Sequence, residues 1–153
     1  MKNLTRREAI KTGVAGAGLI LSNSLVGEEK KFQANDIVEL GKTGIKTSRL
    51  AMGTGMKGGN RQSRHTRMGQ EKFTKLVRHG IDRGLMMMDL ADWYGTHDFT
   101  RNALKGVDRE KYTLETKLWT RNTPGFTPSG GAIKEIDRFR KELGTDYIDM
   151  VLI

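Results

Sequence analysis

Hydrophobic residues along this chain follow two kinds of pattern, which predict strands and helices in turn. The apolar runs at 85–88 and 147–153 are typical of strands that are buried on both faces of a parallel sheet. Between such runs, apolar residues recur at helical spacing. In 70–83, one helix face is expected to carry Phe73, Leu76, Val77 and Ile81. The pattern therefore predicts an α/β fold.

The expected elements alternate along the chain. A β-hairpin is expected over 37–48, strands over 49–52, 85–88, 112–116 and 147–153, a polar loop to Met68, and helices over 70–83, 98–104 and 129–143. Ser129 is the expected N-cap of the last helix, whose apolar side is expected to hold Ile133, Ile136, Phe139 and Leu143. Parallel strands joined by helices leave two architectures open, a doubly wound sheet and a (β/α)8 barrel.

The first 27 residues have a different character from the rest. A basic start containing Arg6 and Arg7 precedes an uncharged, Gly/Ala-rich stretch over 12–27, which is the pattern of a secretory signal. The adjacent arginines are typical of the twin-arginine signal. We therefore expect a signal peptide at 1–27, a linker at 28–36, and export to the periplasm or another extracytoplasmic space by the twin-arginine machinery. A buried Gly/Ala helix or a basic tail is the alternative.

Composition narrows the possible chemistry. The 153 residues include 27 Lys and Arg but 18 Asp and Glu, so the formal net charge is +9. The chain has no Cys, which excludes disulfides, thiolate metal sites and a cysteine nucleophile. No apolar run is long enough for a stable membrane span, and no metal site is expected. The basic segment 57–67 could contact phosphates or be a solvated loop. No nucleic-acid partner is expected, because no helix-turn-helix or aromatic-rich pattern accompanies it.

A glycine motif follows the first strand of the predicted sheet. Gly53, Gly55 and Gly58 match the Gly-x-Gly-x-x-Gly pattern of dinucleotide-binding folds. In those folds a helix begins at once and binds the pyrophosphate at its N-terminus. Here a polar loop continues to about residue 70. The pattern therefore argues against that fold, but a glycine-rich turn close to a ligand is still expected.

Three side chains with coherent chemistry stand at predicted strand ends. Asp89 ends an apolar run, Tyr94 follows it closely, and Lys117 ends the next strand. The carboxyl ends of parallel strands gather around one site, so we expect these residues to meet there. A Lys ammonium lowers the pKa of a neighbouring phenol, and an Asp would hold that Lys. Together they would form a general acid for a carbonyl oxygen. Taken singly, each could instead be a cap, packing or solvated residue.

Residues 89–95 resemble the Asp-Thr-Ala-x-x-Tyr-Gly signature of the aldo-keto reductases, with Leu90 in place of the Thr. Residues 40–50, 116–117 and 143–149 resemble further segments of that family in the same order. The resemblance implies a (β/α)8 barrel that reduces aldehydes or ketones with NADPH, or with NADH. It also implies that Tyr94 is the general acid, that Lys117 lowers its pKa, and that Asp89 pairs with Lys117. The implied cofactor-binding residues are Gly53, Thr54 and Asp89.

The resemblance covers only part of the family's barrel. By this comparison the chain reaches the fourth of eight strands, before the family's catalytic His and the strands that hold most of the dinucleotide. We therefore expect the N-terminal half of a (β/α)8 barrel over 37–153, preceded by the signal segment, and inactive as a fragment. A non-catalytic half-barrel that binds another chain and a basic phosphate- or nucleic-acid-binding protein are the alternatives.

Overall fold

A computed structural model describes residues 31–119 and 130–153. The chain divides into two compact units, Met1–Phe32 and Gln33–Ile153, and every described strand and helix belongs to the second. The predicted signal peptide at 1–27 and the predicted cap Ser129 lie outside the described residues. Within the described ranges, none of the helices combines the length and the apolar character that a membrane span requires.

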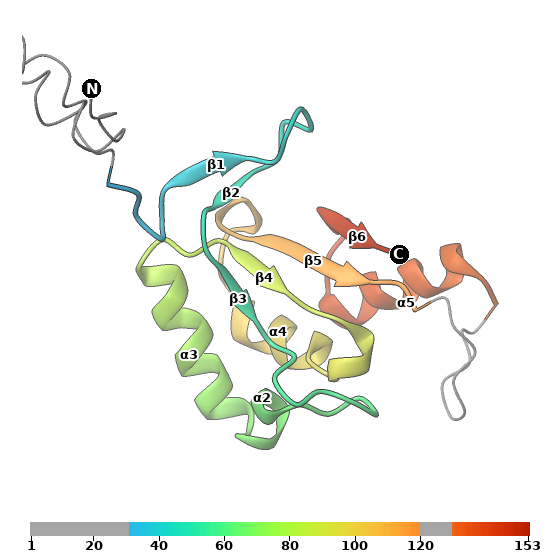
Figure 1. Cartoon of the computed structure of the whole chain (residues 1–153). Helices are drawn as coiled ribbons and strands as arrows, with labels where there is room; N and C mark the ends of the chain where they lie inside the picture. Colours follow the sequence, from blue (N-terminus) through green and yellow to red (C-terminus); the bar gives the residue numbers. More distant parts are fainter. Residues whose placement is uncertain (1–30, 120–129) are drawn as a thin grey trace, which may run out of the picture. The chain divides into compact units, whose positions relative to one another are not determined.

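The second unit contains a hairpin and a parallel sheet (Figure 1). The hairpin pairs β1 (Ile37–Glu39) with β2 (Lys46–Ser48), and the sheet contains β3 (Ala51–Gly53), β4 (Met87–Asp89), β5 (Thr113–Lys117) and β6 (Met150–Leu152). The α-helices are α2 (Arg64–Arg67), α3 (Gln70–Asp82), α4 (His97–Leu104) and α5 (Ala132–Leu143), with 3-10 turns η1 (Asp92–Tyr94) and η2 (Arg109–Lys111).

Strand order decides between the two expected architectures. The four strands are parallel and lie in the order β3-β4-β5-β6, which is also their order along the chain. A doubly wound sheet reverses its strand order at a switch point, whereas a barrel adds each strand beside the previous one. The helices cover one face of the sheet (Figure 1). The unit is therefore a partial (β/α)8 barrel, as the sequence predicts.

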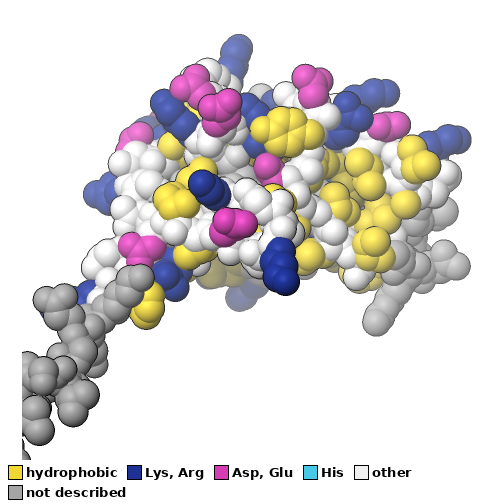
Figure 2. All heavy atoms as spheres, turned by 90° about the horizontal axis from the view of Figure 1, so that it is seen from above, with side chains coloured by type: hydrophobic (Ala, Val, Ile, Leu, Met, Phe, Trp, Pro, Cys, Tyr) yellow, Lys and Arg dark blue, Asp and Glu magenta, His cyan; other side chains and the backbone are white. Residues whose placement is uncertain are grey.

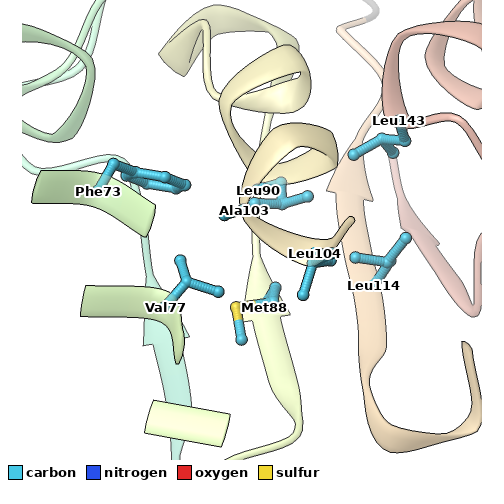
Figure 3. Packing of buried hydrophobic residues seen from close by; sticks show 8 residues of the cluster. All are labelled: Phe73, Val77, Met88, Leu90, Ala103, Leu104, Leu114 and Leu143. Atoms are coloured by element: carbon cyan, nitrogen blue, oxygen red, sulfur yellow. The ribbon is translucent and has the colours of Figure 1, made fainter. Parts of the chain in front are cut away.

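The hydrophobic core lies between the sheet and its helices (Figure 3). Helix α3 contributes Phe73 and Val77, and the sheet contributes Met88 and Leu114, all of them fully or almost fully buried. The cluster is completed by Leu90, Ala103, Leu104 and Leu143. Because Met88 and Leu114 face the helices, their strand neighbours Asp89 and Glu115 face the opposite side of the sheet. The core thereby orients the polar residues at the strand ends.

Helix α5 differs from its prediction. It begins at Ala132 with Gly131 as the N-cap, and Ile133 is 79% exposed rather than part of the apolar side. The inward positions are held by Glu135, Phe139 and Leu143. A carboxylate can occupy such a position because the Arg138 guanidinium lies 2.6 Å from the Glu135 carboxylate oxygen. In α3, similarly, Leu76 of the predicted apolar face is 38% exposed.

Segment boundaries differ elsewhere as well, and the strands predicted over 49–52, 85–88 and 112–116 each begin one or two residues later. The predicted polar loop contains α2, which begins at a capping box formed by Ser63 and Thr66. Residues 33–36 of the predicted linker belong to the folded unit, since the backbone N–H of Arg49 donates to the Asp36 carbonyl at 2.8 Å. Strand β6 begins only at Met150, and just before it the Asp149 carboxylate accepts a hydrogen bond from the Leu114 N–H at 2.8 Å.

Candidate active site

The predicted pair of Asp89 and Lys117 lies at the carboxyl end of the sheet. Each residue ends its strand, β4 or β5, and the two strands are neighbours. The Lys117 ammonium donates a short hydrogen bond to the Asp89 carboxylate and another to the Leu90 carbonyl at 3.1 Å. The register of the two strands and the alternation of side chains along each strand therefore bring together two side chains that are 28 residues apart in the sequence.

A second carboxylate also binds Lys117. The ammonium donates to Glu115 Oε1 at 3.1 Å, and the Glu115 residue is only 8% exposed. Partial burial lowers the pKa of Lys117, but the hydrogen bonds to Asp89 and Glu115 outweigh it and raise this pKa above its ordinary value. Lys117 is therefore held in its charged form at neutral pH. No role for Glu115 was predicted from the sequence, although an acid inside a buried strand, two residues before Lys117, was a usable signal.

Tyr94 reaches the same site from the turn η1. The Lys117 ammonium lies 5.6 Å from the centroid of the Tyr94 ring, within the range of a cation–π contact. Within residues 31–119 and 130–153, no hydrogen bond engages the phenol hydroxyl. The structure thus brings Asp89, Tyr94 and Lys117 together, with the cation near the ring and the hydroxyl available to another group.

The glycine motif serves the packing of Tyr94. A β-carbon on Gly55 would lie 2.4 Å from the Tyr94 ring, and one on Gly58 would lie 2.7 Å from it. Distances below 3.0 Å are not tolerated by real β-carbons. Two of the three motif glycines are therefore needed to leave space for this tyrosine. This packing accounts for them, and no role in binding a pyrophosphate is required.

Gly53 and Thr54, the predicted cofactor contacts, differ in exposure. Gly53 is exposed and pairs in register with Asp89. Thr54 is fully buried, and its hydroxyl donates to the Asp89 carbonyl at 2.8 Å and bonds to the Thr96 hydroxyl at 2.9 Å. Gly53 therefore leaves open space beside the Asp89 carboxylate, whereas the Thr54 side chain fixes the ends of β3 and β4 to each other.

An ion-pair network supports the turn that carries Tyr94. Asp92 is 4% exposed, and its two oxygens each accept a hydrogen bond at 3.0 Å, one from Arg61 and one from Arg138. Arg138 also binds Glu135 and Glu142 of its own helix. These residues were missed in the sequence because charges on a helix are usually solvated, and nothing in the local pattern shows that they turn inward.

The same network contains a group of conceivable metal ligands. Asp92, His97 and Glu142 each offer a ligand atom, and these atoms lie within 4.8 Å of one another. However, Arg138 already binds both carboxylates, while the His97 ring nitrogens bond to Glu142 at 2.8 Å and to Thr116 at 2.9 Å. Bound guanidinium groups occupy the place that a cation would take. The group is a set of ion pairs and carries no argument for a metal.

Two tryptophans adjoin the site in the sequence. Trp93 immediately precedes Tyr94, and Trp119 follows Lys117 by two residues. Their rings stack with centroids 5.7 Å apart and planes 9° apart. The pair thus links the turn after β4 to the segment after β5.

Comparison with known proteins identifies the family that the fold and the site define. The sequence model of the Aldo/keto reductase family matches residues 49–153. The chain therefore belongs to the aldo-keto reductase family. A sequence comparison with curated proteins gives no match.

Solved structures resemble the chain over part of their length. A thermostable aldo-keto reductase in complex with the inhibitor epalrestat is 29% identical, with a TM-score of 0.61 over 76% of this chain and 42% of that one. A Bombyx mori aldo-keto reductase in complex with NADP is 25% identical, with a TM-score of 0.55 over 80% and 38%. An aldo-keto reductase from Klebsiella pneumoniae in complex with NADPH is 22% identical, with a TM-score of 0.54 over 72% and 36%. The chain thus spans less than half the length of these relatives.

Proposed function

We propose that this chain is the N-terminal half of a reductase that converts aldehydes or ketones to alcohols with NADPH, or alternatively with NADH. The observation that carries the proposal is the meeting of Asp89, Tyr94 and Lys117 at the carboxyl end of the sheet. Family membership supports an oxidoreductase. The NADP and NADPH complexes of two relatives support the choice of cofactor.

The site offers features that fit a nicotinamide cofactor. Gly53 is exposed beside Asp89, so a flat ring can approach the strand end without meeting a side chain. NADPH, when bound there, supplies the hydride. The Thr54 hydroxyl is engaged inside the protein, so we expect Thr54 to act by holding Asp89 in place rather than by touching the cofactor.

Each member of the polar group has a separate task in this proposal. Tyr94 holds a proton on its phenol oxygen and gives it to the carbonyl oxygen as negative charge develops there. The Lys117 ammonium, close to the ring, stabilises the negative charge left on the phenolate. Asp89 keeps Lys117 in position and charged. The small carbonyl substrate would therefore bind with its carbonyl oxygen next to the Tyr94 hydroxyl.

The reaction itself provides the test. The full-length protein is incubated with NADPH and a series of aliphatic and aromatic aldehydes, and both the loss of reduced nicotinamide and the alcohol formed are measured. We expect one alcohol per NADPH consumed. Cofactor binding without any carbonyl reduction across the series would contradict the proposal.

The 153 residues alone are expected to turn over little or no substrate. Within the described residues, β3 and β6 form the two edges of a four-stranded sheet, whereas a barrel closes on itself. Assaying this chain beside the full-length protein tests the expectation, and equal turnover by both would contradict it. If neither protein shows any turnover, the result favours the alternative of a non-catalytic half-barrel that binds another chain.

A phosphate- or nucleic-acid-binding role receives less support. The basic segment uses its arginines internally, since Arg61 binds Asp92, Arg64 contacts the Met56 sulfur, and Arg67 donates to the Lys57 carbonyl. On the face seen in Figure 2, Lys and Arg are interspersed with Asp and Glu rather than gathered in one patch. Nucleic-acid binding depends on such a patch.

We also propose that the protein is exported in its folded state by the twin-arginine machinery. The support is the order of the first 27 residues, with Arg6-Arg7 before an uncharged stretch. A cofactor-dependent enzyme that folds before export is compatible with this route. Export of a folded reporter fused to residues 1–35 tests the proposal.

A further inference from the structure

Two carboxylates share the Lys117 ammonium, and the fold puts them side by side. Asp89 of β4 and Glu115 of β5 are paired Cα partners in the parallel register. In-register residues of neighbouring strands project to the same face of the sheet, so both carboxylates face away from the helices. Lys117, two residues after Glu115, projects to that face as well, and its ammonium bonds to both acids.

This arrangement is costly without the ammonium. The side chain of Glu115 is 11% exposed, and two negative charges on adjacent strands repel each other. A buried carboxylate without a partner strongly destabilises the folded protein. Lys117 offsets both effects, but one ammonium between two carboxylates leaves the group of three with a net negative charge. Glu115 therefore does more than accept a hydrogen bond from Lys117, because its carboxylate also makes the net charge of the site negative.

The other titratable group that faces Lys117 is the phenol of Tyr94, from the turn η1. On the far side of β5, strand β6 contributes Met150, Val151 and Leu152, none of which titrates. Within the described residues, the titratable groups that face Lys117 are therefore Asp89, Glu115 and Tyr94.

We propose that Glu115 is a positioning residue of the site, which holds the Lys117 ammonium charged and in place near the Tyr94 ring. The inference deepens the proposed function, on which its catalytic consequence rests. Asp89 binds the ammonium from the neighbouring strand, while Glu115 binds it from the same strand. Because two acids and the Leu90 carbonyl bind the ammonium, it has little freedom to move away from the Tyr94 ring.

The direct test measures the titration of Lys117 in the 153-residue chain. Competitive acetylation across a pH series, read by mass spectrometry, gives the pH of half-maximal labelling for each lysine. In Glu115→Gln, which keeps the shape but removes the charge, we expect the midpoint for Lys117 to fall by about one pH unit. Glu110→Gln, in an exposed position of η2, is the matched control and should leave it unchanged. An unchanged Lys117 midpoint in Glu115→Gln would overturn the proposal.

The unaltered chain supplies a second measurement in case Glu115→Gln does not fold. Lys111 is exposed and pairs with one acid, Asp108, at 3.1 Å. If Glu115 acts as proposed, Lys117 titrates at a higher pH than Lys111, because it is bound by two acids, whose effect outweighs the opposing effect of its partial burial. A Lys117 midpoint at or below that of Lys111 would overturn the proposal without any variant.

The pH–rate profile of the reductase distinguishes a positioning role of Glu115 from a merely structural one. In the full-length reductase, Glu115→Gln should move the alkaline limb of the pH–rate profile to lower pH, because the site loses a negative charge. Glu115→Asp, which keeps the charge, should restore part of this shift. A lower melting temperature with an unchanged profile would show a structural role and overturn the proposal. If Lys117 shifts but no reduction occurs, the proposed function fails while the role of Glu115 on Lys117 stands.

Discussion

The Tyr94 ring lies so close to Gly55 that a β-carbon on Gly55 would be 2.4 Å from it. Gly55 follows β3 and Tyr94 belongs to the turn after β4, so the contact ties two β/α connections together. The residue after the tyrosine, Gly95, has a φ of 67°, and a β-carbon there would lie 1.9 Å from the Arg61 carbonyl oxygen. Gly55 thus leaves space for the Tyr94 ring, and Gly95 lets the chain after Tyr94 pass close to the Arg61 backbone.

The first prediction follows from this contact. Gly55→Ala forces the added methyl group into the Tyr94 ring, and overpacking of this kind costs about 1–3 kcal/mol. We expect the free energy of unfolding, measured with urea on the 153-residue chain, to fall by that amount. Gly53→Ala is the matched control, since its β-carbon meets only the Asp89 carboxylate at an ordinary 3.8 Å. Equal losses in both variants would contradict the packing argument.

The second prediction concerns acid stability through Glu142. Burial raises the pKa of Glu142, but hydrogen bonds from His97 and Arg138 outweigh it and lower this pKa below its ordinary value of 4.5. A carboxyl group with a lowered pKa in the folded state stabilises the protein above its ordinary pKa. That stability is lost as the pH falls through the folded-state value.

The measurement is a series of thermal melts from neutral pH to below pH 4.5, the ordinary pKa of Glu142. Glu142→Gln should be less stable than the unaltered chain at neutral pH, and the difference should shrink as the pH falls. Glu71→Gln removes an exposed acid that pairs with Lys75, and it should follow the unaltered chain at every pH. A constant difference between Glu142→Gln and the unaltered chain would refute the linkage.

The third prediction tests export. Residues 1–35 are fused to a reporter that is active only after export in the folded state. The fusion should give a signal outside the cytoplasm, and replacing both Arg6 and Arg7 by Lys should abolish it, because the twin-arginine machinery reads this pair. Replacing Lys2 and Lys11 by Arg leaves the pair intact and serves as the control. Continued export of the Arg-to-Lys fusion would exclude the twin-arginine route.

The sequence predicted the order of elements because each strand and helix carries its own local pattern. The spacing of Phe73 and Val77 was determined by burial, and both residues are buried. The runs 85–88 and 147–153 were predicted to be buried on both faces, and this was wrong in part: only Met88 of the first run is buried, and Leu152 of the second is 43% exposed. Since parallel strands align their carboxyl ends, the meeting of Asp89 with Lys117 was predictable too. The roles of the strand-end residues in catalysis stay predictions.

Residues that act through long-range ion pairs were not predictable in the same way. Arg138 and Asp92 are 46 residues apart, and each has the composition of an ordinary surface position. Likewise, Ile133 was assigned to the apolar face because hydrophobicity alone does not show that Glu135 can be buried beside Arg138. The glycine motif was correctly separated from the doubly wound dinucleotide-binding fold, but its relation to Tyr94 required coordinates.

Removal of the Tyr94 hydroxyl tests the central claim most directly. Tyr94→Phe keeps the ring that Gly55 and Lys117 contact, so cofactor affinity should be nearly unchanged. The proton donor is lost, and the kcat for carbonyl reduction by the full-length protein should fall by about 10²–10⁴-fold. Tyr147→Phe, whose ring lies against Arg109 at 3.9 Å, makes the same chemical change elsewhere and should retain full activity. A Tyr94→Phe enzyme as fast as the unaltered protein would contradict the account.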